Sequence, residues 1–73
     1  MGRDDAQITN RLRLLRAERQ ITQAELAKAV RVTRVTISCI ERGEYHPSLA
    51  LVLKLARFFN TPVEEIFSLE EES

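Results

Sequence analysis

The side chains best suited to do chemistry in this chain lie in one short segment, from Thr33 to Glu41. At the spacing of a helix, Ile37 and Ile40 share one face and are expected to point inward. The outward positions are then Arg34, Val35, Ser38 and Cys39. An arginine fork and small side chains of this kind can set a helix into the major groove of duplex DNA. The chemistry that they predict is recognition rather than catalysis.

Two short helical patterns joined by a tight bend would hold this segment in place. Thr22 and Glu25 have the spacing of a capping box, which predicts the start of the first helix. Apolar residues then recur at helical spacing at Leu26, Ala27 and Val30. Thr33 can cap the second helix, and only Arg31 and Val32 separate the two patterns. So short a connection predicts a helix-turn-helix.

A helix is predicted ahead of this pair, and a loop follows it. The apolar positions of the leading helix are Ile8, Leu12 and Leu15. This helix is expected to end near residues 19–20. In the loop, Gly43 is the expected C-cap, and Pro47 prevents helical structure immediately before Ser48.

Two more helices are predicted beyond the loop. The apolar positions of the fourth helix are Leu49, Val52, Leu53, Ala56 and Phe59. Asn60 tolerates a left-handed backbone and is expected to end that helix. Thr61 and Glu64 form a second capping box, with Pro62 at the first helical position, which predicts a short fifth helix through Phe67. The predicted fold is therefore all-α, a compact five-helix bundle.

Length and composition limit what the chain can be. Its 73 residues allow one domain, with a core over about residues 8–67 and flexible ends at 1–7 and 69–73. The longest apolar run, residues 49–53, is too short to span a bilayer. A single cysteine forms no internal disulfide, and the first residues lack the apolar core of a signal peptide, so a cytoplasmic protein is expected.

Charge is divided unevenly along the chain, although the formal net charge is zero. Residues 6–43 contain eight Lys or Arg against three Glu, whereas the charged residues from Asn60 onward are all acidic. A basic segment of this kind favours phosphate binding. One His and one Cys cannot supply the four ligands of a zinc site, so no metal and no cofactor are predicted.

Several of these motifs occur together in one known family. The chain resembles the Cro and phage-repressor type of helix-turn-helix regulators, also called the xenobiotic-response-element family, from about Ile8 to Phe67. The matching stretches are residues 11–16, 22–27, 32–34, 36–38, 40–43, 47–49, 54–56 and 63–67. The resemblance implies a lambda-repressor-like DNA-binding bundle.

The resemblance also implies roles for individual residues. Base contacts are expected from Arg34, Val35, Thr36, Ser38 and Cys39. Phosphate contacts are expected from Gln23, Thr33, Arg42, Tyr45, Arg31 and Arg11. Three alternatives stay open: a solvated Gln23, an Arg34 that binds only phosphate, and a redox-sensing Cys39. Arg16 and Glu41 are expected to form a buried ion pair, against the alternative of two surface charges.

Two departures from the family pattern stand out. Arg31 occupies a position where the family usually has glycine, so the turn is either remodelled or keeps this charge to bind phosphate. Leu14, Leu51 and Phe58 stand where the family is usually polar or small. They suggest a homodimer surface, whose expected members are Leu51, Phe58, Val63, Phe67 and Leu69; scattered surface hydrophobes are the alternative.

The predicted function is a sequence-specific regulator of transcription that binds double-stranded DNA as a homodimer on an inverted repeat. The resemblance favours a repressor over an activator. A restriction-modification controller would be one such protein. The alternative is a protein-interaction module with this fold, such as an antitoxin or a transcription bridging factor. An enzyme is not expected, because the sequence has no acid/base pair, phosphate-cradling glycine loop or metal cluster.

Overall fold

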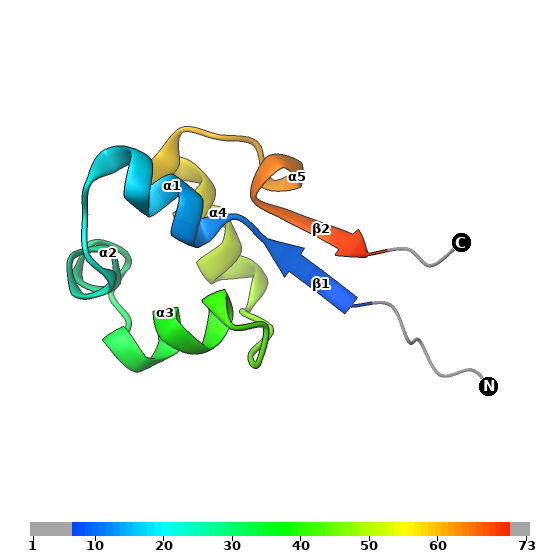
Figure 1. The fold of residues 1–73 in the computed structure, drawn as a ribbon, viewed down its shortest axis with the longest axis horizontal. Helices are drawn as coiled ribbons and strands as arrows, with labels where there is room; N and C mark the ends of the chain where they lie inside the picture. The colour runs from blue at the N-terminus through cyan, green and yellow to red at the C-terminus, as the bar shows by residue number, and fades with distance from the viewer. Residues whose placement is uncertain (1–6, 71–73) are drawn as a thin grey trace.

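Five helices and a two-stranded ribbon make up the computed structural model, which describes residues 7–70 (Figure 1). The elements in chain order are β1 (Gln7–Asn10), α1 (Leu12–Arg19), α2 (Gln23–Val30), α3 (Arg34–Glu41), α4 (Leu49–Phe59), α5 (Val63–Ile66) and β2 (Phe67–Glu70). The helices form the body of the molecule, and the ribbon projects from one end of it (Figure 1).

Local capping chemistry fixes the helix-turn-helix as predicted. The Glu25 amide donates to Thr22 Oγ1 at 3.0 Å, and the Thr22 amide donates to Glu25 Oε1 at 2.8 Å, which completes the capping box of α2. At the start of α3, the Thr36 amide donates to Thr33 Oγ1 at 3.2 Å. The turn between the helices passes through Arg31, whose φ of 66° and ψ of 48° are left-handed. The turn thus keeps the geometry that favours glycine.

The start of α5 differs from the prediction. Its N-cap is Pro62, and the helix has no side-chain cap. The Thr61 hydroxyl instead donates to the Phe59 carbonyl at 2.8 Å, an orphan acceptor at the end of α4, so the second capping box does not form. The helix also ends at Ile66, one residue earlier than expected.

The ribbon shows that the all-α prediction was wrong in one respect. Residues 7–10 were expected to be flexible or helical, but β1 pairs antiparallel with β2, with Ile8 opposite Leu69 and Asn10 opposite Phe67. The Thr9 and Ser68 hydroxyls lie 3.0 Å apart across the ribbon. Residues 69–70 therefore belong to a strand, while the predicted flexibility of 1–6 and 71–73 concerns residues outside those described. Apolar spacing missed the ribbon because its strands are separated by most of the chain.

The core draws on every helix. Its buried members are Leu12, Leu26, Ala27, Val30, Ile37, Ile40, Leu51, Leu55, Phe59 and Ile66. In α4 the buried positions are spaced by four residues, which places Leu51 inside at 7% exposure and leaves Leu49 and Leu53 outside at 72% and 53%. The prediction for α4 was therefore wrong at Leu49 and Leu53, although Phe59 is buried as expected, because the apolar run 49–53 covers most of the helix circumference.

Arg19 joins the end of α1 to the end of α4. Its guanidinium donates to the carbonyls of Phe58 and Phe59 at 3.2 and 2.8 Å, and it lies 5.3 Å from the centroid of the Phe59 ring. A cation is favourable there, because these carbonyls form the negative end of the α4 dipole. The contact helps to fix α1 above the core.

Candidate nucleic-acid interface

One side of α3 is open to solvent while the opposite side is anchored in the core. Ile37 and Ile40 are buried, whereas Arg34 is exposed and Val35 is 60% exposed. The remaining expected base-contacting residues, Thr36, Ser38 and Cys39, are half-buried. The α3 helix lies along the lower edge of the molecule in Figure 1. Its outer side chains are therefore free to approach a partner.

A buried ion pair ties the end of α3 to α1. Arg16 Nε lies 2.6 Å from Glu41 Oε2, and Arg16 Nη2 donates to Glu41 Oε1 at 3.1 Å. The two side chains are only 15% and 7% exposed. Arg16 Nη1 also donates to the Ile21 carbonyl at 3.0 Å, so the guanidinium connects α1, the turn after α1, and α3.

The charge of Glu41 is stabilised in spite of its burial. Desolvation by itself raises the pKa of this carboxyl group, but hydrogen bonds from Arg16 and Gln23, with the charges of Arg16 and Arg13, outweigh it. The net result is a pKa below the ordinary value for glutamate. The same hydrogen bond to Glu41 raises the pKa of Arg16. Both groups are thus charged at neutral pH.

Two further hydrogen bonds connect this ion pair to the exposed start of α3. Gln23 Nε2 donates to Glu41 Oε1 at 3.0 Å, and Arg34 Nη1 donates to Gln23 Oε1 at 3.3 Å. We call the four residues Arg16, Glu41, Gln23 and Arg34 the anchor network. It gives Gln23 a definite orientation at the start of α2 and places the Arg34 guanidinium beside it.

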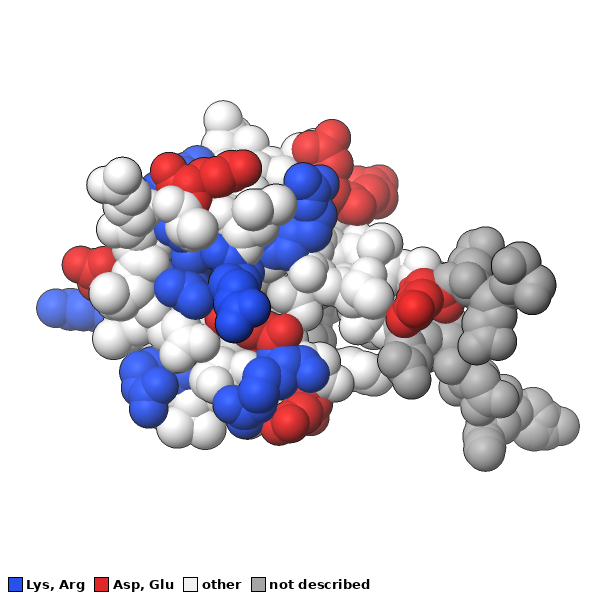
Figure 2. All heavy atoms as spheres, in the orientation of Figure 1, with Lys and Arg blue, Asp and Glu red and all other residues white. Residues whose placement is uncertain are grey.

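A wide groove of about 940 Å³ lies between α1 and α3, next to the anchor network. Its lining residues are Asn10, Arg11, Arg13, Leu14, Arg16, Gln23, Ser38, Glu41, Arg42 and Glu44. Figure 2 shows basic side chains gathered on this face, with acidic atoms between them. Arg11 and Arg42, expected to bind phosphate, both line the groove. Sequence reasoning missed Arg13, although it belongs to the same basic segment.

Arg42 extends back over the outer side of α3. It donates to Ser38 Oγ at 2.7 Å and to Glu44 Oε1 at 3.1 Å, and it lies 3.6 Å from Cys39 Sγ. The Arg42–Glu44 pair is more than half exposed, so solvent screens it. The Arg42 guanidinium can therefore leave the Glu44 carboxylate and bind another anion in its place.

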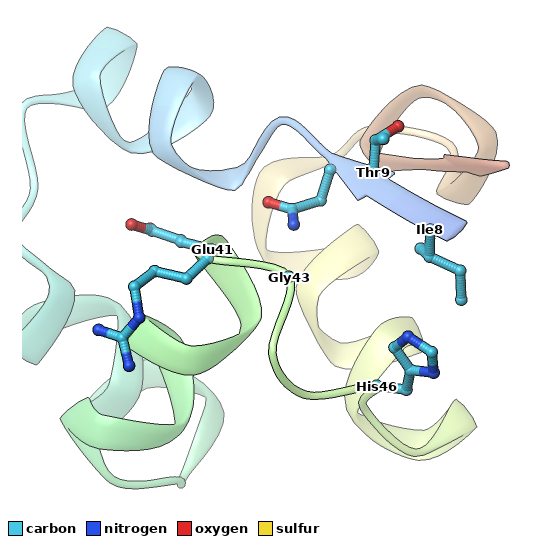
Figure 3. Close-up of a pocket in the computed structure, with 7 residues that line it drawn as sticks. Ile8, Thr9, Glu41, Gly43 and His46 are labelled. Atoms are coloured by element: carbon cyan, nitrogen blue, oxygen red, sulfur yellow. The ribbon is translucent and has the colours of Figure 1, made fainter. Parts of the chain in front are cut away.

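A smaller hollow of about 500 Å³ separates β1 from the loop after α3 (Figure 3). Asn10 crosses it: its Nδ2 donates to the Ile40 carbonyl at 2.8 Å, while its Oδ1 accepts from the Leu12 amide at 3.1 Å. His46 is exposed at the far side, near Ile8 (Figure 3). Asn10 thus fixes the end of α3 to the start of α1. This role of Asn10 was not predicted, because residues 8–19 were expected to form one helix. An Asn just before a helix is nevertheless a common start signal.

The other predicted residues are distributed over different surfaces. Thr33 is exposed at the cap of α3, and Tyr45 is exposed in the loop after it. Arg31 lies apart from the groove, beside Lys54 and Arg57 of α4. Of the five expected dimer residues, Leu51 is buried in the core, Phe58, Val63 and Phe67 are half-buried, and Leu69 is exposed. The prediction that Leu51 lies on the surface was wrong.

Neither a membrane-spanning helix nor a metal site is found in the part of the chain that the structure describes. No helix in residues 7–70 is long and apolar enough to cross a bilayer. The same residues contain no group of three His, Cys, Asp or Glu side chains that could hold a metal ion.

Comparison with known proteins gives matches over most of the chain. The helix-turn-helix family model HTH_3 matches residues 12–66. An uncharacterized HTH-type transcriptional regulator of Archaeoglobus fulgidus is 50% identical over 62 residues, which are 85% of this chain and 87% of that protein. The cryptic phage CTXphi transcriptional repressor RstR of Vibrio cholerae is 36% identical over 63 residues, 86% of this chain and 57% of RstR.

A solved structure extends the similarity to three dimensions. The restriction-modification controller protein C.AhdI of Aeromonas hydrophila superposes with a TM-score of 0.70 at 34% identity. The match covers 75% of this chain and 83% of the controller.

Proposed function

The chain belongs to the Cro and phage-repressor type of helix-turn-helix family and is a transcriptional regulator with a DNA-binding domain, and we propose that it represses transcription as a homodimer on an inverted-repeat operator. The observation that carries this proposal is the exposed outer side of α3, held in a fixed position by the anchor network. A reading helix must be open on one side and immobile on the other.

Base readout is assigned to the outer positions of α3. The Arg34 fork suits the O6 and N7 atoms of guanine, and exposed Val35 suits the methyl group of thymine. Thr36, Ser38 and Cys39 complete the set with short side chains that let the backbone come close. Repression follows as the simplest outcome, since a bound dimer blocks the promoter by its size.

Phosphate contacts are assigned to the rim around α3. Gln23 and Thr33 stand at helix starts, where backbone amides and the helix dipole favour anions. Arg42, Tyr45, Arg11 and Arg13 surround the groove or the following loop. Because such contacts release counterions, duplex affinity is expected to fall steeply with salt.

Selection of bound sequences from a random duplex pool tests this function. The enriched sequences are expected to contain an inverted repeat whose half-sites lie about one helical turn, ~34 Å, apart. Binding should weaken as salt rises, and unselected duplexes should bind more weakly than the enriched site. An unenriched pool, or no binding to any duplex at low ionic strength, would contradict the proposal.

The homodimer contacts are assigned to three exposed leucines, Leu49 and Leu53 of α4 and Leu69 of β2, which together we call the leucine surface. They are 53–72% exposed, and Leu49 and Leu53 are spaced by four residues on one side of α4. This assignment leaves out Leu51, which is buried in the core, and Phe58, which lies on another side of α4 and lines a pocket with Ala29 and Val30 of α2. Half-buried Val63 and Phe67 stay in the proposed surface, as their apolar atoms are partly open to solvent.

Replacing Leu53 with Glu is expected to make the protein monomeric, because the dimer would have to bury an unpaired carboxylate. Sedimentation at tens of micromolar, without DNA, should show a dimer for the unchanged protein and a monomer for Leu53→Glu. Leu14→Glu is the matched control, since Leu14 is an exposed leucine on α1, outside this surface. A monomeric unchanged protein, or equal effects of both variants, would refute the assignment.

The exposed leucines also favour a second candidate function, a protein-interaction module such as an antitoxin or a bridging factor. In that case the leucine surface would bind a different protein, and the α3 face would be dispensable. Leu53→Glu would then abolish activity, whereas Arg34→Ala and Gln23→Ala would barely change it.

A further inference from the structure

A small pocket lies between α2 and α4 and shares no lining residue with the groove beside α3. Its volume is about 280 Å³, and its lining residues are Ala29, Val30, Arg31, Lys54, Arg57 and Phe58. Val30 is buried and Phe58 is half-buried, with the Phe58 ring packed edge-on against Phe59 at a centroid distance of 5.0 Å. The base of the pocket is therefore carbon, supported by the core.

Three cations surround this carbon base. Arg31, Lys54 and Arg57 line the pocket, and no acidic residue does. Within residues 7–70 none of the three forms an ion pair or a side-chain hydrogen bond. Arg16 and Arg42, by contrast, both contact a carboxylate. A group of like charges that has no acidic partner within the described residues, beside an apolar surface, lowers the energy of an anion placed among them.

Arg31 reaches the pocket from the turn that ends α2. Its left-handed conformation, with φ at 66°, favours glycine, and a residue with a Cβ is strained there by about 1–2 kcal/mol. Gln20 and Asn60 end α1 and α4 in the same conformation, so this strain belongs to the end of a helix. At Arg31 it is tolerated by a residue whose side chain lines the pocket.

We propose that this pocket binds an organic carboxylate with a small apolar body. The Arg31 or Arg57 fork would bind the carboxylate oxygens, and Lys54 would add a third charge. The apolar body would cover Val30 and Phe58. The size of the pocket favours a small molecule over a peptide, and its carbon base favours an organic anion over inorganic phosphate.

Titration with benzoate and hexanoate, followed by amide NMR, tests the proposal on the whole protein. Both probes are expected to give saturable shifts at residues 29–31 and 54–58. Benzyl alcohol lacks the charge and phosphate lacks the apolar body, so each should bind at least about tenfold more weakly at equal ionic strength. Absence of saturation by either carboxylate, or equal shifts with phosphate, would overturn the proposal.

A pair of double variants separates the pocket from general charge attraction. Lys54→Gln with Arg57→Gln should weaken benzoate binding at least about tenfold. Lys28→Gln with Arg13→Gln removes the same charge from exposed residues outside the pocket and should leave benzoate binding unchanged. Equal losses in both would show nonspecific attraction and refute the site. The readout does not involve duplex DNA, so its failure would leave the proposed regulator function intact.

Discussion

Replacing Glu41 with Gln is expected to lower the free energy of unfolding by about 3 kcal/mol at neutral pH. The substitution keeps the shape of the side chain but leaves the Arg16 guanidinium buried without a counter-charge. We take the low end of the range for broken buried pairs, because Arg16 keeps some exposure and its bond to the Ile21 carbonyl. Urea denaturation measures the loss directly.

Glu44→Gln is the matched control for this prediction. It breaks the ion pair with Arg42, whose side chains are both more than half exposed, so it should cost less than about 1 kcal/mol. If Glu41→Gln unfolds at the same urea concentration as Glu44→Gln, the pair does not stabilise the fold as argued.

The pH dependence of stability gives a second readout of the same pair. The folded pKa of Glu41 is lowered, so the unfolded chain binds a proton more readily than the folded protein does. The contribution of Glu41 is therefore complete above the ordinary glutamate pKa, about 4.3, and is lost as the pH falls through the folded value. Glu41→Gln should lack this part of the acid destabilisation.

Replacing Arg34 with Ala is expected to reduce the affinity of the dimer for the selected operator by at least about 30-fold, because each of the two subunits loses one bidentate base contact of ~1–3 kcal/mol. Affinity for unrelated duplex should fall much less, so the ratio of specific to nonspecific binding is the quantity to measure. Arg57→Ala is the control, since it removes one positive charge from α4, away from α3.

The selected sequences should also change at one position. Repeating the selection with Arg34→Ala should relax the preference for guanine at the base pair that Arg34 reads. An equal loss on all duplexes would make Arg34 a phosphate contact. No loss at all, together with a strong effect of Leu53→Glu, would favour the protein-interaction module.

The elements predictable from sequence were those fixed by neighbouring residues. The caps at Thr22 and Thr33 and the left-handed Asn60 act within one helical turn, so their spacing predicted the helix ends. The ribbon could not be found this way, because residue 8 pairs with residue 69. Local spacing contains no information on such a distant partner.

The buried face of α4 and the contacts of the anchor network were predictable to different degrees. In α4, residues 49–53 are all apolar, so several helix faces look equally fit for the core, and only packing against α2 and α5 selects Leu51. The pairing of Arg16 with Glu41 was implied by the family resemblance. The link from Gln23 to Arg34 depends on side-chain directions that no spacing rule specifies.

Asn10 stands where the ribbon meets the rest of the protein. Its backbone is paired with Phe67, while its side-chain amide is bonded to the Ile40 carbonyl in the last turn of α3. A pull on the ribbon, such as the drag of a tag fused at either end, therefore reaches α3 by two routes: directly through this amide, and through α1 and its Arg16–Glu41 pair. Any fusion to this protein needs enough slack in its linker to keep that force away from α3.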